Sequence, residues 1–214
     1  MKKNETVTKG GESGAGARGS YLKGRRRREA IVDAAMVIFG RQGYQNAAFA
    51  AVAEEVGLTL PGLLHHFPRK VDLLLAVLER RDEMARTMLP AEGGDWPDML
   101  KALVAIVRHN ESIPGVVRVF ALLSVECLAD DHPAKEWFER RMNETRTMIA
   151  DAFRVGIGRG TLDAALSPES LASEVIAMMD GLQEQWLRSG QSLDMSGIFE
   201  AYTKRLVRDL SQEA

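Results

Sequence analysis

Three short helical segments in close succession most constrain the fold of this 214-residue chain. From Glu29 onward, apolar residues recur at helical spacing, and Gly43 stands where the first segment would end. A second apolar stripe runs from Phe49 to Val56 and stops at Gly57, a residue type that readily adopts the left-handed conformation. Asn46 can cap this second helix. The closely spaced segments predict a helix-turn-helix.

The third segment, GLTLPGLLHHFPRK over residues 57–70, carries the local signals of a helix start. Thr59 can cap the helix, and Pro61 falls in its first turn, where a missing backbone N–H costs nothing. Leu63 and Phe67 are expected to point back onto the first two helices.

The remainder of the chain also has a helical pattern, so we predict an all-α protein of about nine helices. An N-terminal three-helix head would precede a larger C-terminal helical part. The charged segment 79–83 (ERRDE) is expected to be a solvated face of the fourth helix. Gly156, Gly158 and Gly160 follow a helix and no strand, so we interpret them as a helix stop rather than a phosphate-binding loop.

Charge is distributed unevenly along the chain. Residues 1–70 carry twelve Lys and Arg against six Asp and Glu, whereas residues 71–214 carry sixteen against twenty-four. Contact with a polyanion is therefore expected only in the N-terminal part. Residues 1–22 are rich in glycine and poor in large apolar side chains, which predicts a disordered arm. The four arginines at 25–28 favour polyanion binding, with a solubilising tail as the alternative.

Several classes of protein lack support in the sequence. No apolar run is long enough for a membrane span, and the N-terminus lacks the apolar core of a secretory signal, so we expect a cytoplasmic protein. Cys127 is the single cysteine, and His65 and His66 point in different directions on a helix, so no metal site or cofactor is predicted. An all-helical enzyme has little support because no P-loop, nucleophile elbow or HExxH motif occurs.

Residues 25–75 resemble the TetR family of bacterial transcription regulators. The resemblance rests on the following positions: Gly43-Tyr44, Val52-Ala53, Gly57-Leu58-Thr59, Leu63, His66-Phe67, Lys70 and Leu73-Leu74. It implies a homodimer whose heads, residues 23–70, bind a palindromic operator in double-stranded DNA. Residues 71–214 would hold a small-molecule cavity and the dimer contact, and ligand binding would release the DNA from a repressor.

By position in the family, one group of residues would face bases and another would meet phosphates. The predicted DNA-contacting residues are Lys23, Arg25, Arg26, Arg27, Arg28, Asn46, Thr59, Leu60, Pro61, Gly62, Leu64, His65, His66 and Lys70. The family usually has tyrosine where this chain has Leu64, and Ala47, Ala48 and Ala50 stand where threonine or basic residues often contact DNA. Because no Arg, Asn or Gln on this helix can read a base edge, we expect the basic residues at 23 and 25–28 to compensate through phosphate or minor-groove contacts.

A largely apolar effector would bind among the inward positions of helices five to eight, although a stripe of Met and aromatic residues can simply be core. The candidates are Met99, Leu103, Val107, Phe120, Leu123, Ser124, Cys127, Trp137, Met142 and Met178. Arg118, Glu126 and Gln183 could orient a polar group of the ligand or be surface residues. His109 and His132 are interpreted as surface or capping groups.

The last two helices carry apolar residues on more than one stripe, which favours a four-helix interface between subunits over a helix buried in a monomer. The candidates are Ile176, Met179, Gly181, Leu182, Trp186, Tyr202 and Leu206. A protein-interaction module of the same fold without specific DNA binding remains the alternative function.

Overall fold

The computed structural model describes residues 13–44, 46–91, 94–128, 131–132 and 134–211. Over these ranges the chain forms nine helices and no strand, which confirms the predicted fold class. The helices are α1 (Ser13–Gln42), α2 (Phe49–Glu55), α3 (Leu60–His66), α4 (Lys70–Arg86), α5 (Trp96–Glu111), α6 (Pro114–Glu126), α7 (Lys135–Gly158), α8 (Pro168–Arg188) and α9 (Met195–Leu210). None of the helices in the described ranges is long and apolar enough to cross a membrane.

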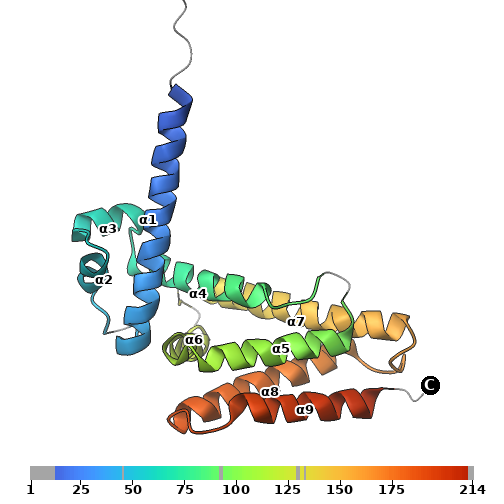
Figure 1. Ribbon diagram of the computed structural model, residues 1–214. Coiled ribbons are helices and arrows are strands. Elements are labelled where there is room, and N and C mark those ends of the chain that lie inside the picture. Colours follow the sequence, from blue (N-terminus) through green and yellow to red (C-terminus); the bar gives the residue numbers. More distant parts are fainter. Residues whose placement is uncertain (1–12, 45, 92–93, 129–130, 133, 212–214) are drawn as a thin grey trace, which may run out of the picture.

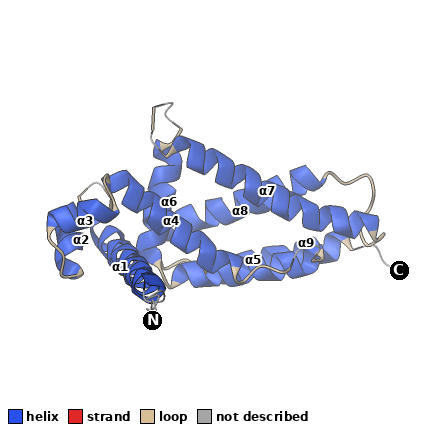
Figure 2. Ribbon diagram, turned by 90° about the horizontal axis from the view of Figure 1, so that it is seen from above, coloured by secondary structure: helices blue, strands red, loops and turns tan. Residues whose placement is uncertain are grey.

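The head lies at one end of the molecule. In Figure 1, α1 stands upright, α2 and α3 lie against its lower half, and α4 to α9 extend to one side of it. The view from above in Figure 2 shows the same separation, with α3 and α2 at the end opposite the C-terminus. Since α4 leaves the head directly after α3, the head is joined to the larger part without a linker.

The expected disordered arm is wrong for residues 13–22, which belong to α1; residues 1–12 lie outside the described ranges. Extending an existing helix adds one backbone hydrogen bond for each residue fixed, and this helix is already nucleated by the segment after Glu29. Alanine, arginine and leucine within 13–22 are good helix formers. The proposed division at residue 70 stays a prediction.

Two apolar clusters make up the core. The C-terminal cluster lies between α5, α7, α8 and α9 and includes Trp96, Phe153 and Phe199. The second, here called the head-side core, joins α1, α2 and α3 to α4, to α6 and to Trp137 of α7. The apolar residues of α4 and α6 therefore connect the head to the larger part.

A close approach of two backbones fixes α6 against α1. Gly40 of α1 and Gly115 of α6 face each other so closely that a Cβ at Gly115 would lie 2.4 Å from the Gly40 Cα. Glycine is required at position 115 because a side chain there would collide with backbone atoms of α1. This contact places α6 beside the lower end of α1 (Figure 1).

Candidate functional site

Local signals position α3 as the sequence predicts. Gly57 has a φ of 64° where α2 ends, and the Thr59 hydroxyl accepts a hydrogen bond of 3.2 Å from the Gly62 N–H. Leu63 is fully buried in the head-side core, and Phe67, the residue after α3, is buried there too. Burial of this side of α3 leaves its other side exposed.

That exposed side carries the predicted base-facing residues. Leu60 and Leu64 keep 41% and 38% of their surface, and His65 is also exposed. Thr59 and Pro61 are exposed, and Gly62 is half-buried. The arrangement is an apolar face with one imidazole, and it lacks a guanidinium or amide that could read a base edge.

The basic segment of α1 lies close to this face. Lys23 and the arginines at 25–28 are exposed. The Nη1 group of Arg27 donates a hydrogen bond of 3.1 Å to the Val56 carbonyl, and the guanidinium of Arg28 lies 4.6 Å from the centre of the Phe67 ring. These two arginines are thus tied to the ends of α2 and α3, so the positive charge is held beside α3.

Two half-buried side chains, His66 and Lys70, lie beside this positive surface. The His66 pKa is lowered by partial burial and, to a smaller extent, by the positive fields of His65, Arg27 and Arg28. Lys70 lies at the start of α4 with its ammonium 4.7 Å from the Tyr44 ring. An anion entering this region would relieve the repulsion that acts on His66.

The expected cap of α2 is wrong, and one of the three alanines near it is buried. Asn46 does not cap α2: the N-cap is Ala48, which makes no side-chain cap bond, and the Asn46 amide instead lies 3.4 Å from the Gln42 carbonyl at the end of α1. Ala47 retains 2% of its surface and belongs to the head-side core, so only Ala48 and Ala50 are exposed among the three alanines compared with the family pattern.

A cavity of about 780 Å³ lies among α4, α5, α6, α7 and α8. Cavities that bind small molecules typically have this size. Four of the predicted candidates line it: Val107, Phe120, Ser124 and Met142. The three possible polar contacts, Arg118, Glu126 and Gln183, line it as well. The exposed side chains of Leu122 and Val125 are also part of the wall, so the cavity reaches the surface beside α6.

The other candidates are absent from the cavity lining. Met99 and Leu103 are buried in the C-terminal cluster, and Met178 packs against it. Leu123 and Trp137 are buried in the head-side core. Helical periodicity identifies these as inward residues but does not say which of two neighbouring spaces they enter.

Cys127 also lies outside the lining, in a contact with His132 after α6. Its Sγ lies 2.9 Å from the His132 Nδ1, and burial raises the pKa of the thiol to about 11. The same Nδ1 accepts a hydrogen bond of 3.2 Å from the Ala134 N–H, so His132 organises the turn before α7. This agrees with the capping interpretation of His132. His109 is at the end of α5, and its Nε2 is buried without a hydrogen-bond partner among the described residues.

A charged cluster at the inner end of the cavity is the main feature that the sequence analysis missed. Arg81 and Asp82 keep only 6% and 7% of their surface, so the expectation of a solvated face over 79–83 is wrong at these two positions. The Nε of Arg141, from α7, lies 2.7 Å from an oxygen of Asp82, and Arg81 Nη1 lies 3.5 Å from the other oxygen. Arg81 follows Leu74 and Leu78 at helical spacing, which is the signal that could have placed it inward.

Aromatic and electrostatic contacts hold this cluster. The guanidiniums of Arg81 and Arg141 lie 4.5 and 4.7 Å from the centre of the Phe120 ring. Burial lowers the Arg81 pKa to about 10, and repulsion from Arg141 adds to this effect. Arg81 nevertheless stays protonated at neutral pH.

The predicted dimer residues occupy different environments. Leu182 and Trp186 are buried in the C-terminal cluster, which leaves little of their surface for a second chain, and their contact with one stays a prediction. Ile176, Met179 and Gly181 line the cavity, while Tyr202 and Leu206 pack partly buried against the C-terminal cluster. In the described ranges, no three side chains of His, Cys, Asp or Glu are grouped so that they could hold a metal ion.

Comparison with known proteins gives consistent matches. The family model described as "Bacterial regulatory proteins, tetR family" matches residues 31–77. The HTH-type transcriptional repressor BepR of Brucella suis is 24% identical over 78% of this chain and 84% of its own length. The HTH-type transcriptional regulator TtgR of Pseudomonas putida is 27% identical over 82% of this chain and 87% of its own length.

The fold is shared with solved structures. A TetR transcriptional regulator from Chloroflexus aurantiacus superposes with a TM-score of 0.74 at 23% identity, covering 90% of this chain and all of that one. The likeness extends through the larger part of the molecule as well as the head.

Proposed function

Because the chain belongs to the TetR family of bacterial regulatory proteins, we propose that it represses transcription by binding operator DNA and is controlled by a small molecule. The observation that carries this proposal is the position of α6, which packs against α1 of the head and also lines the cavity. The relative BepR is named a transcriptional repressor, which supports repression rather than activation.

The head supplies the DNA contacts in this proposal. The exposed side of α3 enters the major groove, where Leu60 and Leu64 suit thymine methyl groups and His65 is the polar reader. The basic segment of α1 contacts phosphates or the minor groove, because Arg27 and Arg28 hold it beside α3. His66 and Lys70 complete the phosphate contacts.

A homodimer is part of the proposal, because one short helix with few polar readers needs a second half-site for specificity. Tyr202 and Leu206 remain the candidates on α9 for this contact. A protein that binds chromosomal DNA in a bacterium acts in the cytoplasm, where we place it. The named relatives are regulators, and we propose no enzymatic activity.

An effector that moves α6 would move α1, because the two backbones meet at Gly40 and Gly115 without intervening side chains. Displacing α1 changes the direction of α3 and hence the separation of the two heads of a dimer. We therefore expect ligand binding to lower DNA affinity, with a coupling free energy of about 1–3 kcal/mol per site.

The test is fluorescence anisotropy of the full chain on DNA fragments from upstream of its own gene, at several salt concentrations. Tight, salt-sensitive binding to one fragment is expected. The double variant His65→Ala, His66→Ala should weaken it, and Arg26→Ala should also reduce the salt slope by about 1 for each lost phosphate contact.

Arg146→Ala is the matched control, because Arg146 is exposed on α7 and, within the described part of the chain, hydrogen-bonds only to Asn143 of the same helix. Uniformly weak binding to every fragment in a genome-wide selection, unchanged by the head variants, would refute sequence-specific regulation. That outcome would favour the protein-interaction module.

A further inference from the structure

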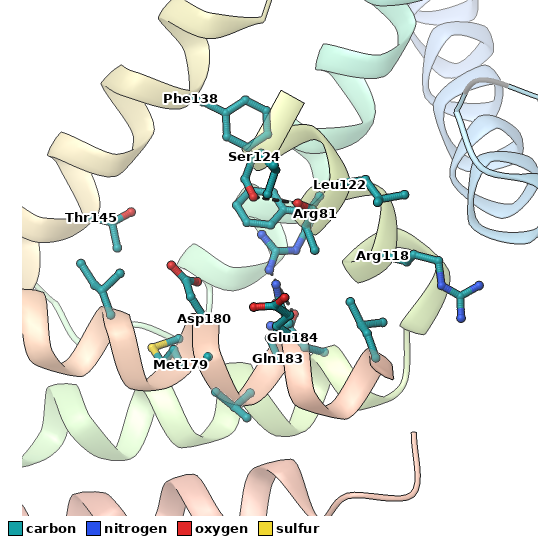
Figure 3. Close-up of a pocket in the computed structure, with 18 of the residues that line it drawn as sticks. Arg81, Arg118, Leu122, Ser124, Phe138, Thr145, Met179, Asp180, Gln183 and Glu184 are labelled. Carbon is teal, nitrogen blue, oxygen red and sulfur yellow. Dashed lines mark hydrogen bonds between the residues drawn. The ribbon is translucent and has the colours of Figure 1, made fainter. Parts of the chain in front are cut away.

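The cavity has apolar walls and a charged inner end. Ile106, Val107, Ile176 and Met179 supply apolar surface from α5 and α8. In Figure 3 the Arg81 guanidinium projects into the space between α6 and α8, towards Asp180. A molecule that fills this cavity would therefore meet apolar side chains of α5 and α8 and a buried guanidinium at the inner end.

Arg81 is the least satisfied of these charged groups. Its Nε and Nη1 are buried and have no hydrogen-bond partner among the described residues. Its Nη2 donates to the Asn110 oxygen over 3.5 Å, at the outer limit of hydrogen-bond distance. Buried guanidinium N–H groups without good acceptors are costly, and an entering oxyanion would supply strong acceptors.

The acidic groups nearby do not fill this role. Asp82 is held by Arg141 at 2.7 Å and approaches Arg81 only to 3.5 Å. Glu184 pairs with Arg188 at the solvent side of α8. Arg81, Arg141 and Asp82 at the inner end carry two positive charges and one negative charge before Asp180 is counted.

Asp180 also lines the cavity, and both Arg81 and Arg141 act on its carboxylate electrostatically. Its side chain is open to the cavity, but the surrounding protein raises the Asp180 pKa, even though Arg141 and Arg81 act in the opposite direction. An anion that enters beside Asp180 would raise this pKa further, whereas Arg81 keeps its proton at neutral pH. A cation at the same place would be repelled by both arginines.

We propose that the effector is an apolar molecule with a carboxylate at one end, and that Arg81 receives this carboxylate. The planar guanidinium can bind both carboxylate oxygens at once, which a single cation such as lysine cannot do. This inference rests on the proposed function only in that it calls the bound molecule the effector.

Three probes of equal chain length test the proposal by isothermal titration calorimetry on the full chain without DNA: decanoate, decan-1-ol and decyltrimethylammonium, each below its aggregation concentration. We expect decanoate to bind about tenfold to a hundredfold more tightly than decan-1-ol, the range given by a charge-assisted hydrogen bond. Decyltrimethylammonium should bind no more tightly than the alcohol.

Variants assign the preference to named residues. Arg81→Gln should bring the ratio of decanoate to decan-1-ol affinity close to one, with helical content checked by circular dichroism. Asp180→Asn changes a side chain open to the cavity, and it should increase decanoate affinity severalfold by removing a competing negative charge. Arg146→Gln, outside the cavity, should leave the ratio unchanged.

If Arg81→Gln does not fold, the Asp180→Asn result still decides the matter. Equal affinity for the three probes, binding of none, or a preference for decyltrimethylammonium that is lost in Asp180→Asn would overturn the proposal. Because calorimetry needs no operator, these outcomes are separate from a failure of DNA binding, which would instead contradict the proposed function.

Discussion

Alanine at Gly115 should separate α6 from α1. The new Cβ would lie 2.4 Å from the Gly40 Cα and 2.6 Å from the Gly40 carbonyl carbon and oxygen, all of them backbone atoms that cannot rotate away. Ordinary van der Waals contact begins at 3.4 Å, so the helices must move apart by about 1 Å. We expect a loss of about 1–3 kcal/mol of unfolding free energy, the usual cost of overpacking.

Alanine substitutions at Gly40 and Gly24 of α1 serve as comparisons for the stability loss expected at Gly115. A Cβ at Gly40 would lie 3.2 Å from the Gly115 Cα, so a shift of a few tenths of an ångström suffices. The gain of about 0.5–1 kcal/mol from replacing a helical glycine by alanine should nearly offset that strain. A Cβ at Gly24 would meet nothing within 4 Å, so Gly24→Ala should be neutral or slightly stabilising.

Urea unfolding followed by circular dichroism, at one fixed protein concentration, measures the series. The expected order of stability is Gly24→Ala, then Gly40→Ala, then Gly115→Ala. A Gly115→Ala protein as stable as Gly24→Ala would refute the close contact. Gly115→Ala should also weaken operator binding, because the head rests on α6, whereas Gly40→Ala should do so much less.

Three further predictions concern a cap, a thiol and a carboxylate. Thr59→Ala removes the hydroxyl that caps α3 and should cost about 1 kcal/mol in urea unfolding, whereas Thr59→Ser should keep most of that stability; equal losses would show that the cap bond contributes nothing. The Cys127 pKa is about 11 rather than 9.0, so at pH 8 the thiolate population should be about a hundredfold lower than that of an ordinary cysteine. Iodoacetamide should therefore react much faster with the urea-unfolded chain than with the native protein. Similar rates for the two would contradict the raised pKa. Burial raises the Asp180 pKa above its usual 3.8, so between the two values the folded protein binds a proton that the unfolded chain has released, and stability falls as pH rises through that window. Asp180→Asn should remove this decline, and an unchanged stability profile from pH 3.5 upward would show that Asp180 is not its source.

The helix boundaries were predictable because their signals are local. Gly57, Thr59 and Pro61 act within one turn of the place where α3 begins, and Ser167 caps α8 in the same way through the Ser170 N–H. The sequence places these residues next to the backbone groups they affect. Their effect does not depend on the rest of the fold.

The cavity was less predictable because its lining depends on which helices meet. The burial of Asp82 requires Arg141, a residue 59 positions later in the chain, to supply the opposite charge. Likewise, Leu123 and Ser124 are adjacent in sequence, yet one enters the head-side core and the other lines the cavity. Periodicity identifies the inward side of each helix but not the neighbour that it faces.

Phe120 lines the cavity and also belongs to the head-side core, with two guanidiniums packed close to its ring. A library that randomises Phe120 to obtain a sensor for a new compound would therefore alter the support of the head in every member. Many Phe120 variants would fail the screen because they no longer bind the operator, whether or not they bind the new compound. Ile176 and Met179 line the same cavity from α8, outside the head-side core, and are better positions at which to change ligand preference while keeping the response intact.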